Sequence, residues 1–289
     1  ADIRQSRPGS VSMPQQFKSN GYWTASVGKI FHSSKHQQGE ISWHEQIMFQ
    51  NDELPLVAKA RKTYEAEHGS VELRANRKNW KAHVQKLSTQ TRGQTPPGYG
   101  PTGLGDEQHK DGKNVRQIIS WLDQKSYGEK PFFIACGIQK PHVPFLAPQK
   151  YFDQYPVDKL KFPLSPANDW EDMPALAMVK RFQSFGFEMA RENDSLRREY
   201  TQAYHACISY IDAQLGMLFK ALREHDLWQA TIIVFTSDHG YHLGEHFMWG
   251  KVTLFEECAR VPMIIRVPGM TRAGTNTDAL VELVDFHPP

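Results

Sequence analysis

Five side chains that can bind a metal ion or transfer a proton lie within residues 236–246, "TSDHGYHLGEH". Asp238 and His239 are adjacent, and Gly240 after them permits a backbone turn that would let both face one ion. A carboxylate oxygen and an imidazole nitrogen suit a divalent cation, although two ligands do not complete a site. The segment therefore predicts either a metal site whose other ligands come from elsewhere or a structural turn held by hydrogen bonds.

Two lysines and two further histidines occur in short, mostly apolar surroundings. Lys29 and His32 lie in "VGKIFH", His142 lies in "QKPHVPF", and Lys251 lies in "MWGKVTLF". Each lysine taken alone is most simply a solvated surface group. A lysine held beside a cluster of histidines would instead suit an anionic substrate group, because charge-assisted hydrogen bonds to an anion are strong.

The elements that must position these residues are short apolar strands alternating with helices. Strands are predicted over residues 22–27, 131–138, 231–237 and 261–267. Helices are predicted over residues 12–21, 114–124 and 198–228. Strands that are apolar throughout are typical of a sheet buried on both faces. Their alternation with helices predicts an α/β fold with a mostly parallel central sheet and helices on both faces.

The polar residues follow directly after three of the predicted strands. Lys29 and His32 follow the first strand, His142 follows the second, and Asp238 and His239 follow the third. In open α/β sheets, ligands bind outside the carboxyl ends of the strands. If the strands are parallel, these five residues converge at one edge of the sheet.

Composition excludes several classes of protein. The chain has 289 residues with 34 Lys and Arg against 32 Asp and Glu, a net charge of +2. No basic stripe indicates nucleic-acid binding, and no apolar run approaches the roughly 20 residues of a membrane span. Its three cysteines lie among apolar neighbours, so we expect small buried side chains rather than disulfides or zinc ligands. They are Cys136, Cys207 and Cys258.

Three segments resemble blocks of a known family. They are "NGYWTASVGKIFH", "PFFIACGIQKPHVPF" and "TSDHGYHLGEHFMWGKVTLFEECARVPMIIRVPG". In order and spacing they resemble blocks of the type I sulfatases, within the alkaline phosphatase superfamily, with the iduronate-2-sulfatase and choline-sulfatase branch the nearest pattern. The resemblance runs from about residue 11 to 286. It implies an alkaline phosphatase-like fold in one sulfatase catalytic domain over residues 1–289, truncated at both ends, with a loop-rich insert at about 40–112, where the sequence is mostly polar.

The resemblance also implies a role for each matching residue. Asp238 and His239 match two ligands of the family's calcium ion. Lys29 matches a residue that contacts the sulfate and the nucleophile, and His32 one that hydrogen-bonds the nucleophile. Such residue types fit the chemistry, because cations stabilise the charge that develops as the S–O bond breaks.

Three further residues match the substrate side of the family's site. His142 matches a residue that contacts the sulfate and assists the leaving oxygen, and Lys251 matches a lysine that binds sulfate. His246, in "GEH", is a candidate contact to the substrate. A histidine can protonate a leaving alcohol because its pKa lies near working pH.

Two elements of the family pattern do not occur in this sequence. The nucleophile of the family is a formylglycine made from a Cys/Ser-x-Pro-x-Arg motif, and neither this motif nor the family's Asp-Asp pair of metal ligands is found. In the family both precede the block that contains Lys29. We therefore expect a fragment that lacks the N-terminal strand and a C-terminal subdomain and is inactive by itself. Exposed apolar faces and strand edges would make such a fragment prone to aggregation.

The preferred hypothesis is a metal-dependent sulfuric ester hydrolase acting on a sulfated sugar, with another small sulfate ester such as choline sulfate as the second choice. A phosphodiesterase or phosphonate hydrolase of the same superfamily is an alternative, because phosphate and sulfate esters share a tetrahedral geometry. A non-catalytic protein that binds sulfated glycans is the alternative from a different class. Family members are commonly periplasmic, secreted or lysosomal, and no export signal is recognisable here.

Overall fold

A computed structural model describes most of the chain, including every predicted site residue except His32. The described residues are 9–31, 39–49, 55–71, 73, 75–76, 79–80, 82–83, 99–161, 163–174, 177, 193–270 and 272–286. The predicted role of His32 therefore falls outside the described residues.

The central sheet consists of three parallel strands in the order β2-β1-β4. They are β2 (Glu45–Ile47), β1 (Trp23–Gly28) and β4 (Phe132–Gly137). The six residues of β1 lie opposite the six of β4, so that Gly28 faces Gly137 at their carboxyl ends. The segments that follow β1 and β4 therefore leave the sheet at the same edge.

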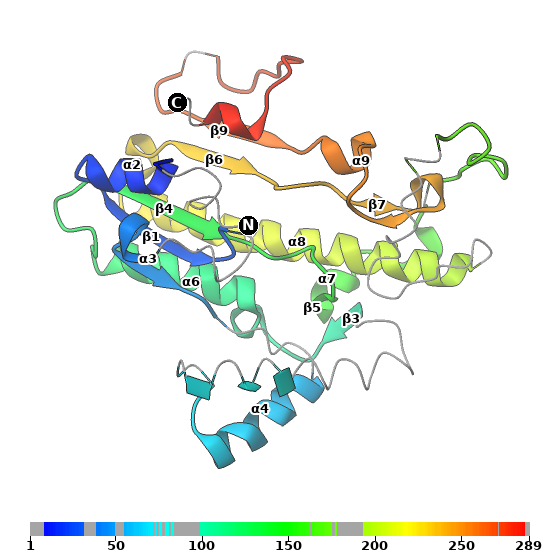
Figure 1. Cartoon of the computed structure of the whole chain (residues 1–289), viewed down its shortest axis with the longest axis horizontal. Helices are drawn as coiled ribbons and strands as arrows, with labels where there is room; N and C mark the ends of the chain where they lie inside the picture. The colour runs from blue at the N-terminus through cyan, green and yellow to red at the C-terminus, as the bar shows by residue number, and fades with distance from the viewer. Residues whose placement is uncertain are drawn as a thin grey trace.

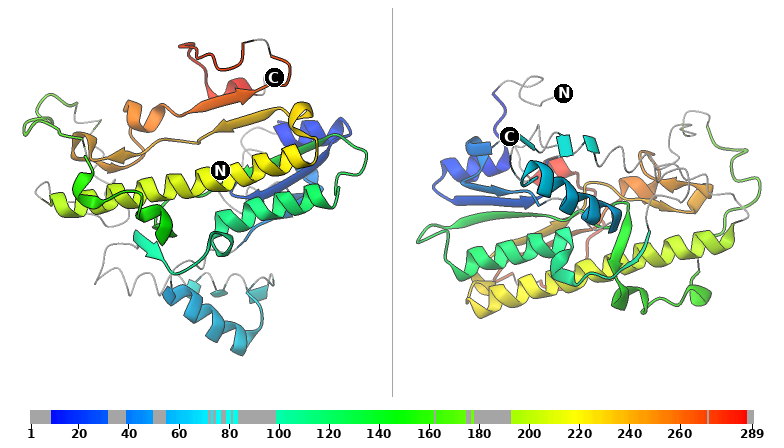
Figure 2. Two further views of the ribbon diagram at one scale, coloured as in Figure 1. Left: turned by 180° about the vertical axis from the view of Figure 1, so that it is seen from behind. Right: turned by 90° about the horizontal axis from the view of Figure 1, so that it is seen from below.

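Helices cover both faces of this sheet, as the sequence predicted. Helix α2 (Met13–Ser19) lies on one face, and α6 (Lys110–Asp123) and α8 (Asp194–Glu224) lie on the other (Figures 1 and 2). Phe17 of α2 stacks on Phe133 of β4 with 4.5 Å between ring centroids. All six residues of β1 are buried, because this strand lies between two neighbours and under both layers of helices.

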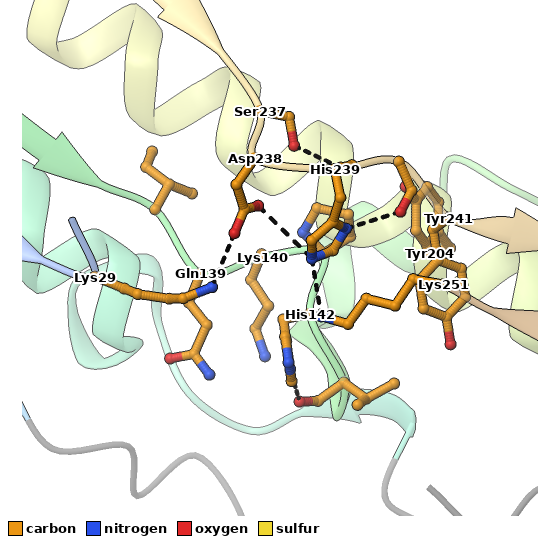
Figure 3. A pocket seen from close by; sticks show the side chains of 14 residues that line it. Lys29, Gln139, Lys140, His142, Tyr204, Ser237, Asp238, His239, Tyr241 and Lys251 are labelled. Atoms are coloured by element: carbon orange, nitrogen blue, oxygen red, sulfur yellow. Dashed lines mark hydrogen bonds and ion pairs between the residues drawn. The ribbon is translucent and has the colours of Figure 1, made fainter. Parts of the chain in front are cut away.

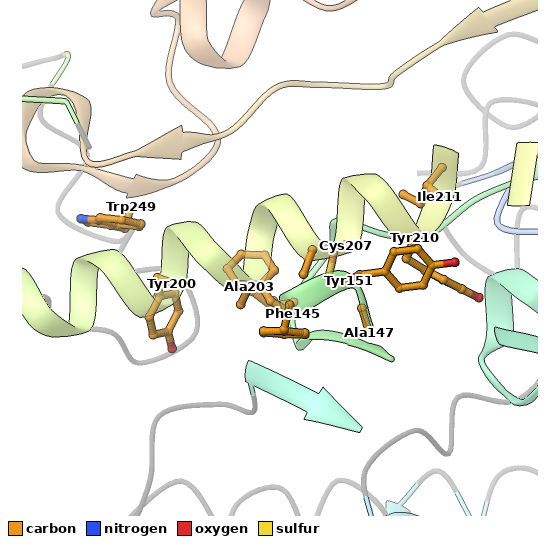
Figure 4. Packing of buried hydrophobic residues seen from close by; sticks show 12 residues of the cluster. Phe145, Ala147, Tyr151, Tyr200, Ala203, Cys207, Tyr210, Ile211 and Trp249 are labelled. Carbon is orange, nitrogen blue, oxygen red and sulfur yellow. The ribbon is translucent and has the colours of Figure 1, made fainter. Parts of the chain in front are cut away.

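A second hydrophobic core fixes the chain just beyond β4. Strand β5 (Phe145–Pro148) pairs in parallel with β3 (Tyr99–Thr102), and α7 (Gln149–Phe152) follows. Phe145 packs edge-on against Tyr200 of α8 with 5.8 Å between ring centroids (Figure 4). The loop between β4 and β5 is thus anchored at both of its ends in buried structure.

The last two predicted strands form a separate ribbon. Strand β6 (Ile233–Thr236) pairs antiparallel with β9 (Met263–Arg266), and within the described residues this pair is not hydrogen-bonded to the central sheet. The expectation of parallel strands buried on both faces is therefore wrong here. Val234, Ile264 and Ile265 are 48%, 61% and 51% exposed. An apolar run specifies a strand but neither the direction of its partner nor what covers its second face.

A short hairpin leads from the ribbon towards the N-terminal end of α8 (Figure 1). It consists of β7 (His242–Leu243) and β8 (Trp249–Gly250), joined through the 3-10 turn η6 (Glu245–Phe247) and followed by α9 (Glu256–Ala259). Further 3-10 turns are η2 (Asp106–Gln108), η3 (Val157–Lys159), η5 (Trp228–Ala230) and η7 (Leu283–Phe286).

The predicted insert at 40–112 is more regular than expected. It contains α3 (Gly39–Ser42), strand β2 of the central sheet, and α4 (Pro55–His68). Val71 and Trp80 form a small cluster with side chains of α4. The polar sequence did not predict these elements, because each of them buries only a few apolar side chains. None of the helices among the described residues combines the length and apolarity that crossing a bilayer requires.

Candidate active site

Five of the seven predicted site residues converge on one pocket at the carboxyl edge of the sheet (Figure 3). Lys29 comes directly after β1, His142 lies in the loop after β4, and Asp238 and His239 follow β6. Lys251, which directly follows β8, also lines the pocket. The other lining residues are Ile138, Gln139, Lys140, Pro141, Val143, Tyr204, Ser237, Gly240 and Tyr241.

Asp238 is held by the lysine that follows β1. Its Oδ2 accepts a hydrogen bond from Lys29 Nζ at 3.1 Å, although the two residues are 209 positions apart in the sequence. Burial acts to raise the pKa of Asp238, but the hydrogen bond and charge of Lys29 outweigh burial and lower it below its usual value. Asp238 is therefore an ionised carboxylate at neutral pH.

The neighbours of His239 fix its tautomer. Its Nδ1 lies 2.8 Å from the Gly240 carbonyl oxygen, which can only accept, so Nδ1 carries the proton. Lys251 Nζ, which can only donate, lies 2.8 Å from Nε2. The free electron pair of His239 is therefore on Nε2, on the side of the ring that faces Lys251 (Figure 3).

Gly240 is required for space and not for a left-handed turn. Its amide donates to the Cys258 carbonyl oxygen at 2.8 Å. A Cβ atom at this position would lie 2.0 Å from the Glu257 carbonyl oxygen, and the backbone φ is not positive. The expectation that Gly240 supplies a special turn is corrected: it allows α9 to pass close to the site.

The spacing of Asp238 and His239 fits two ligands of one cation, which would replace Lys251 at His239 Nε2 because both use the same electron pair. Asp238 Oδ1 lies 3.7 Å from His239 Nε2. Two ligands at about 2.4 Å from a calcium ion and at right angles to each other are about 3.4 Å apart. A histidine that ligates through Nε2 while Nδ1 donates to a backbone carbonyl is the usual arrangement in metal sites. Among the described residues no group of three or more His, Cys, Asp or Glu side chains could hold a metal, so these two would be part of a ligand set.

His142 is half-buried beside the two lysines. Its Nδ1 donates to the Val143 carbonyl oxygen at 2.7 Å, which directs Nε2 away from that carbonyl. Burial lowers the pKa of His142, and the charges of Lys251 and Lys29 lower it further. Burial and the charge of Lys29 also lower the pKa of Lys251. An anion in the pocket would reverse these shifts, because opposite charge favours the protonated forms.

The loop that carries His142 is held by the first turns of α6. Asp111, which is 1% exposed, accepts the Gln139 amide on Oδ1 at 2.9 Å and the Lys140 amide on Oδ2 at 2.8 Å. Asn114 donates to the Gly137 carbonyl oxygen at 3.0 Å. The sequence did not single out these residues. The available signal was an acidic residue in the first turn of a helix, which commonly has only a local role.

His246 lies outside the pocket. Its Nδ1 is 2.9 Å from Asp169 Oδ2, and its amide donates to Ser165 Oγ at 2.9 Å. Trp170 Nε1 donates to the His246 carbonyl oxygen at 2.6 Å, and Phe255 stacks on the imidazole at 4.6 Å. These contacts hold the segment around Asp169 against η6 and favour a structural role. The predicted contact to substrate stays a prediction.

Comparison with known proteins identifies the family. The sequence model of the family described as Sulfatase matches residues 3–288. The chain therefore belongs to the sulfatase family, and its architecture is the alkaline phosphatase-like α/β fold that the resemblance implied.

Individual relatives agree with this assignment. The chain is 31% identical to iduronate 2-sulfatase of Mus musculus, over 96% of this chain and 53% of that protein. It is 29% identical to a sulfatase of Formosa agariphila, over 99% of this chain and 52% of that protein. The chain thus spans about half the length of these relatives. In fold it is similar to the phosphonate monoester hydrolase of Agrobacterium radiobacter, with a TM-score of 0.61 and 19% identity over 89% of this chain and 53% of that one.

Proposed function

We propose that this chain is the greater part of one catalytic domain of a sulfuric ester hydrolase that acts on a sulfated sugar. The main support is that two lysines and a half-buried histidine surround the Asp238–His239 pair in one pocket of a sulfatase-family fold. Three cationic or protonatable groups around one carboxylate suit an anionic ester.

The described residues would divide the work between binding and proton transfer. Lys29 and Lys251 would bind the sulfate oxygens and stabilise the charge that develops on them. His142 would hold the proton that the leaving oxygen takes up, since a bound anion raises its pKa towards the working range. His32, which lies outside the described residues, would hydrogen-bond the nucleophile.

Asp238 and His239 would hold a divalent cation, for which calcium is the proposal. When bound, such an ion supplies positive charge that stabilises developing negative charge on the substrate. The remaining ligands and a formylglycine nucleophile would come from polypeptide outside this sequence, so the isolated chain should not turn over substrate.

A sulfated sugar is the proposed substrate because the similarity to a protein named iduronate 2-sulfatase extends along 96% of the chain. The fold similarity to a phosphonate monoester hydrolase supports a second candidate, hydrolysis of a phosphonate ester. Both esters present a tetrahedral anion, so the lysines by themselves do not distinguish them.

Hydrolysis by the full-length polypeptide that carries this sequence, purified from its source, tests the proposal. Rates for 4-nitrophenyl sulfate and for a 4-nitrophenyl phosphonate monoester should be measured with calcium and after chelation. Faster hydrolysis of the sulfate ester, together with the formylglycine mass in the intact protein, is expected. Preference for the phosphonate ester would overturn the sulfatase assignment in favour of the second candidate.

A further inference from the structure

Gln139 is a pocket residue that is held at both its main chain and its side chain. Its backbone amide donates to Asp111 Oδ1 at 2.9 Å, and its side-chain Oε1 accepts from Lys110 Nζ at 2.9 Å. Both partners lie in the first turn of α6. The side chain lines the pocket on the Lys29 side, away from Lys251 (Figure 3).

The contact with Lys110 determines which end of the amide is available. A lysine ammonium has three donors and no acceptor, so the atom of Gln139 that it contacts must be the oxygen. The –NH2 group is then at the other end of the amide, and within the described part of the chain Nε2 makes no hydrogen bond. The pocket therefore contains, on the side of Lys29, a neutral donor of fixed orientation.

A donor that is already oriented loses little conformational entropy when a ligand binds. A site that is built to hydrogen-bond a particular substrate group also discriminates against analogues that lack this group, because the donor is then left unpaired. The lysines suffice to attract any small anion. An additional neutral donor would add affinity only for an ester with an oxygen acceptor beside its sulfate.

We propose that Gln139 is a specificity-determining residue whose side-chain amide donates to an oxygen acceptor, a hydroxyl or carboxylate, on the sugar that carries the sulfate. This inference rests on the proposed function, because it assumes that the sulfate is bound at Lys29 and Lys251. Lys110 acts through Gln139 as a positioning residue.

Competition with hydrolysis of 4-nitrophenyl sulfate by the full-length polypeptide that carries this sequence tests the assignment, because the inhibition constant of each probe reports its affinity. The probes are iduronic acid 2-sulfate, which has acceptors beside the ester, and methyl sulfate, which has none. Gln139→Leu should weaken binding of the sugar sulfate about five-fold, the value of one neutral hydrogen bond, and change methyl sulfate affinity less than about two-fold. Lys110→Met, which keeps the amide but frees its orientation, should give a smaller loss for the sugar sulfate only.

Gln124→Leu is the matched control, because Gln124 is an exposed glutamine at the opposite end of α6. It should bind both probes as the unaltered chain does. An equal loss for both probes in Gln139→Leu, or no loss for either, would overturn the assignment of Gln139. If neither probe inhibits the unaltered full-length protein, the sulfate pocket of the proposed function is wrong, and the inference fails with it.

Discussion

The two halves of the candidate site are built on unlike supports. Lys29 and His142 follow strands of the central sheet, where Ala25 and Val27 are 0% exposed. Asp238 and His239 follow β6, whose ribbon leaves Val234 48% exposed. Segments with similar strand-forming sequences thus lie in a closed core in one region and on an open surface in the other.

This difference shows that different interactions position the two halves. On the sheet side, buried groups of α6 hold the backbone of the loop that carries His142. On the ribbon side, the contacts are made largely in the pocket itself, where Lys29 bonds Asp238 and Lys251 bonds His239. Substitution of the α6 residues that support the sheet side should therefore lower stability strongly. On the ribbon side, ligand binding should depend mainly on charge.

Removal of the carboxylate that holds the sheet side should have the largest effect. Asp111→Ala leaves two buried amide donors without this acceptor, and we expect the free energy of unfolding to fall by about 3 kcal/mol. Asp111→Asn keeps one side-chain oxygen and should lose about half as much. Urea denaturation measures both, and a loss below about 1 kcal/mol for Asp111→Ala would contradict the role of the α6 contacts.

The same substitution in the two regions should separate core from ribbon. Val27→Thr buries a hydroxyl at a fully enclosed position of β1 and should cost about 2 kcal/mol of unfolding free energy. Val234→Thr changes a position that is 48% exposed and should cost less than about 0.5 kcal/mol. Thermal and urea unfolding of the pair provide the measurement. Equal costs would show that the ribbon is as well buried in solution as the sheet.

Charge should dominate ligand binding on the ribbon side. Lys251→Met removes a charged donor from the pocket and should weaken methyl sulfate binding about ten-fold, or about 1.4 kcal/mol. Lys220→Met is the matched control, since Lys220 lies on the exposed surface of α8 and pairs with Glu224 at 3.5 Å. The control should bind as the unaltered chain does; similar losses in both variants would indicate general electrostatic attraction rather than a site.

The smallest expected effect concerns the pH dependence of stability. Burial, with Lys251 and Lys29, lowers the pKa of His142 below its usual 6.5, so the unfolded chain binds this proton more readily than the folded one. Folding stability from neutral His142 is therefore present above about pH 6.5 and is lost as pH falls below that value. His142→Gln should flatten the decrease in unfolding free energy between about pH 7 and pH 5.5. An unchanged slope in urea titrations would show that His142 binds its proton equally well in the folded and the unfolded chain.

Much of the fold could be predicted from the sequence. The apolar runs located β1, β4, β6 and β9, and apolar periodicity located α6 and α8, although α6 begins at Lys110 rather than at residue 114. Its first turn is polar and has no apolar stripe. Asp111 and Asn114 there serve long-range contacts that a local pattern does not contain.

Part of the site was also predictable. Positions in the segments that follow strands gave Lys29, His142, Asp238 and His239, because the carboxyl ends of neighbouring strands bring distant segments together. Gln139 was not distinguished, since a glutamine in a loop has no chemical signature until Lys110 is found beside it.

Residue type and spacing were enough to specify which segments are strands, which residues follow them, and the resemblance to sulfatases. Tertiary structure alone decided that β6 pairs antiparallel with β9 and is half exposed. It also decided that His246 bonds Asp169 and not the pocket, and that His239 presents Nε2. These outcomes depend on contacts between residues far apart in the chain, whose free energies no local pattern specifies.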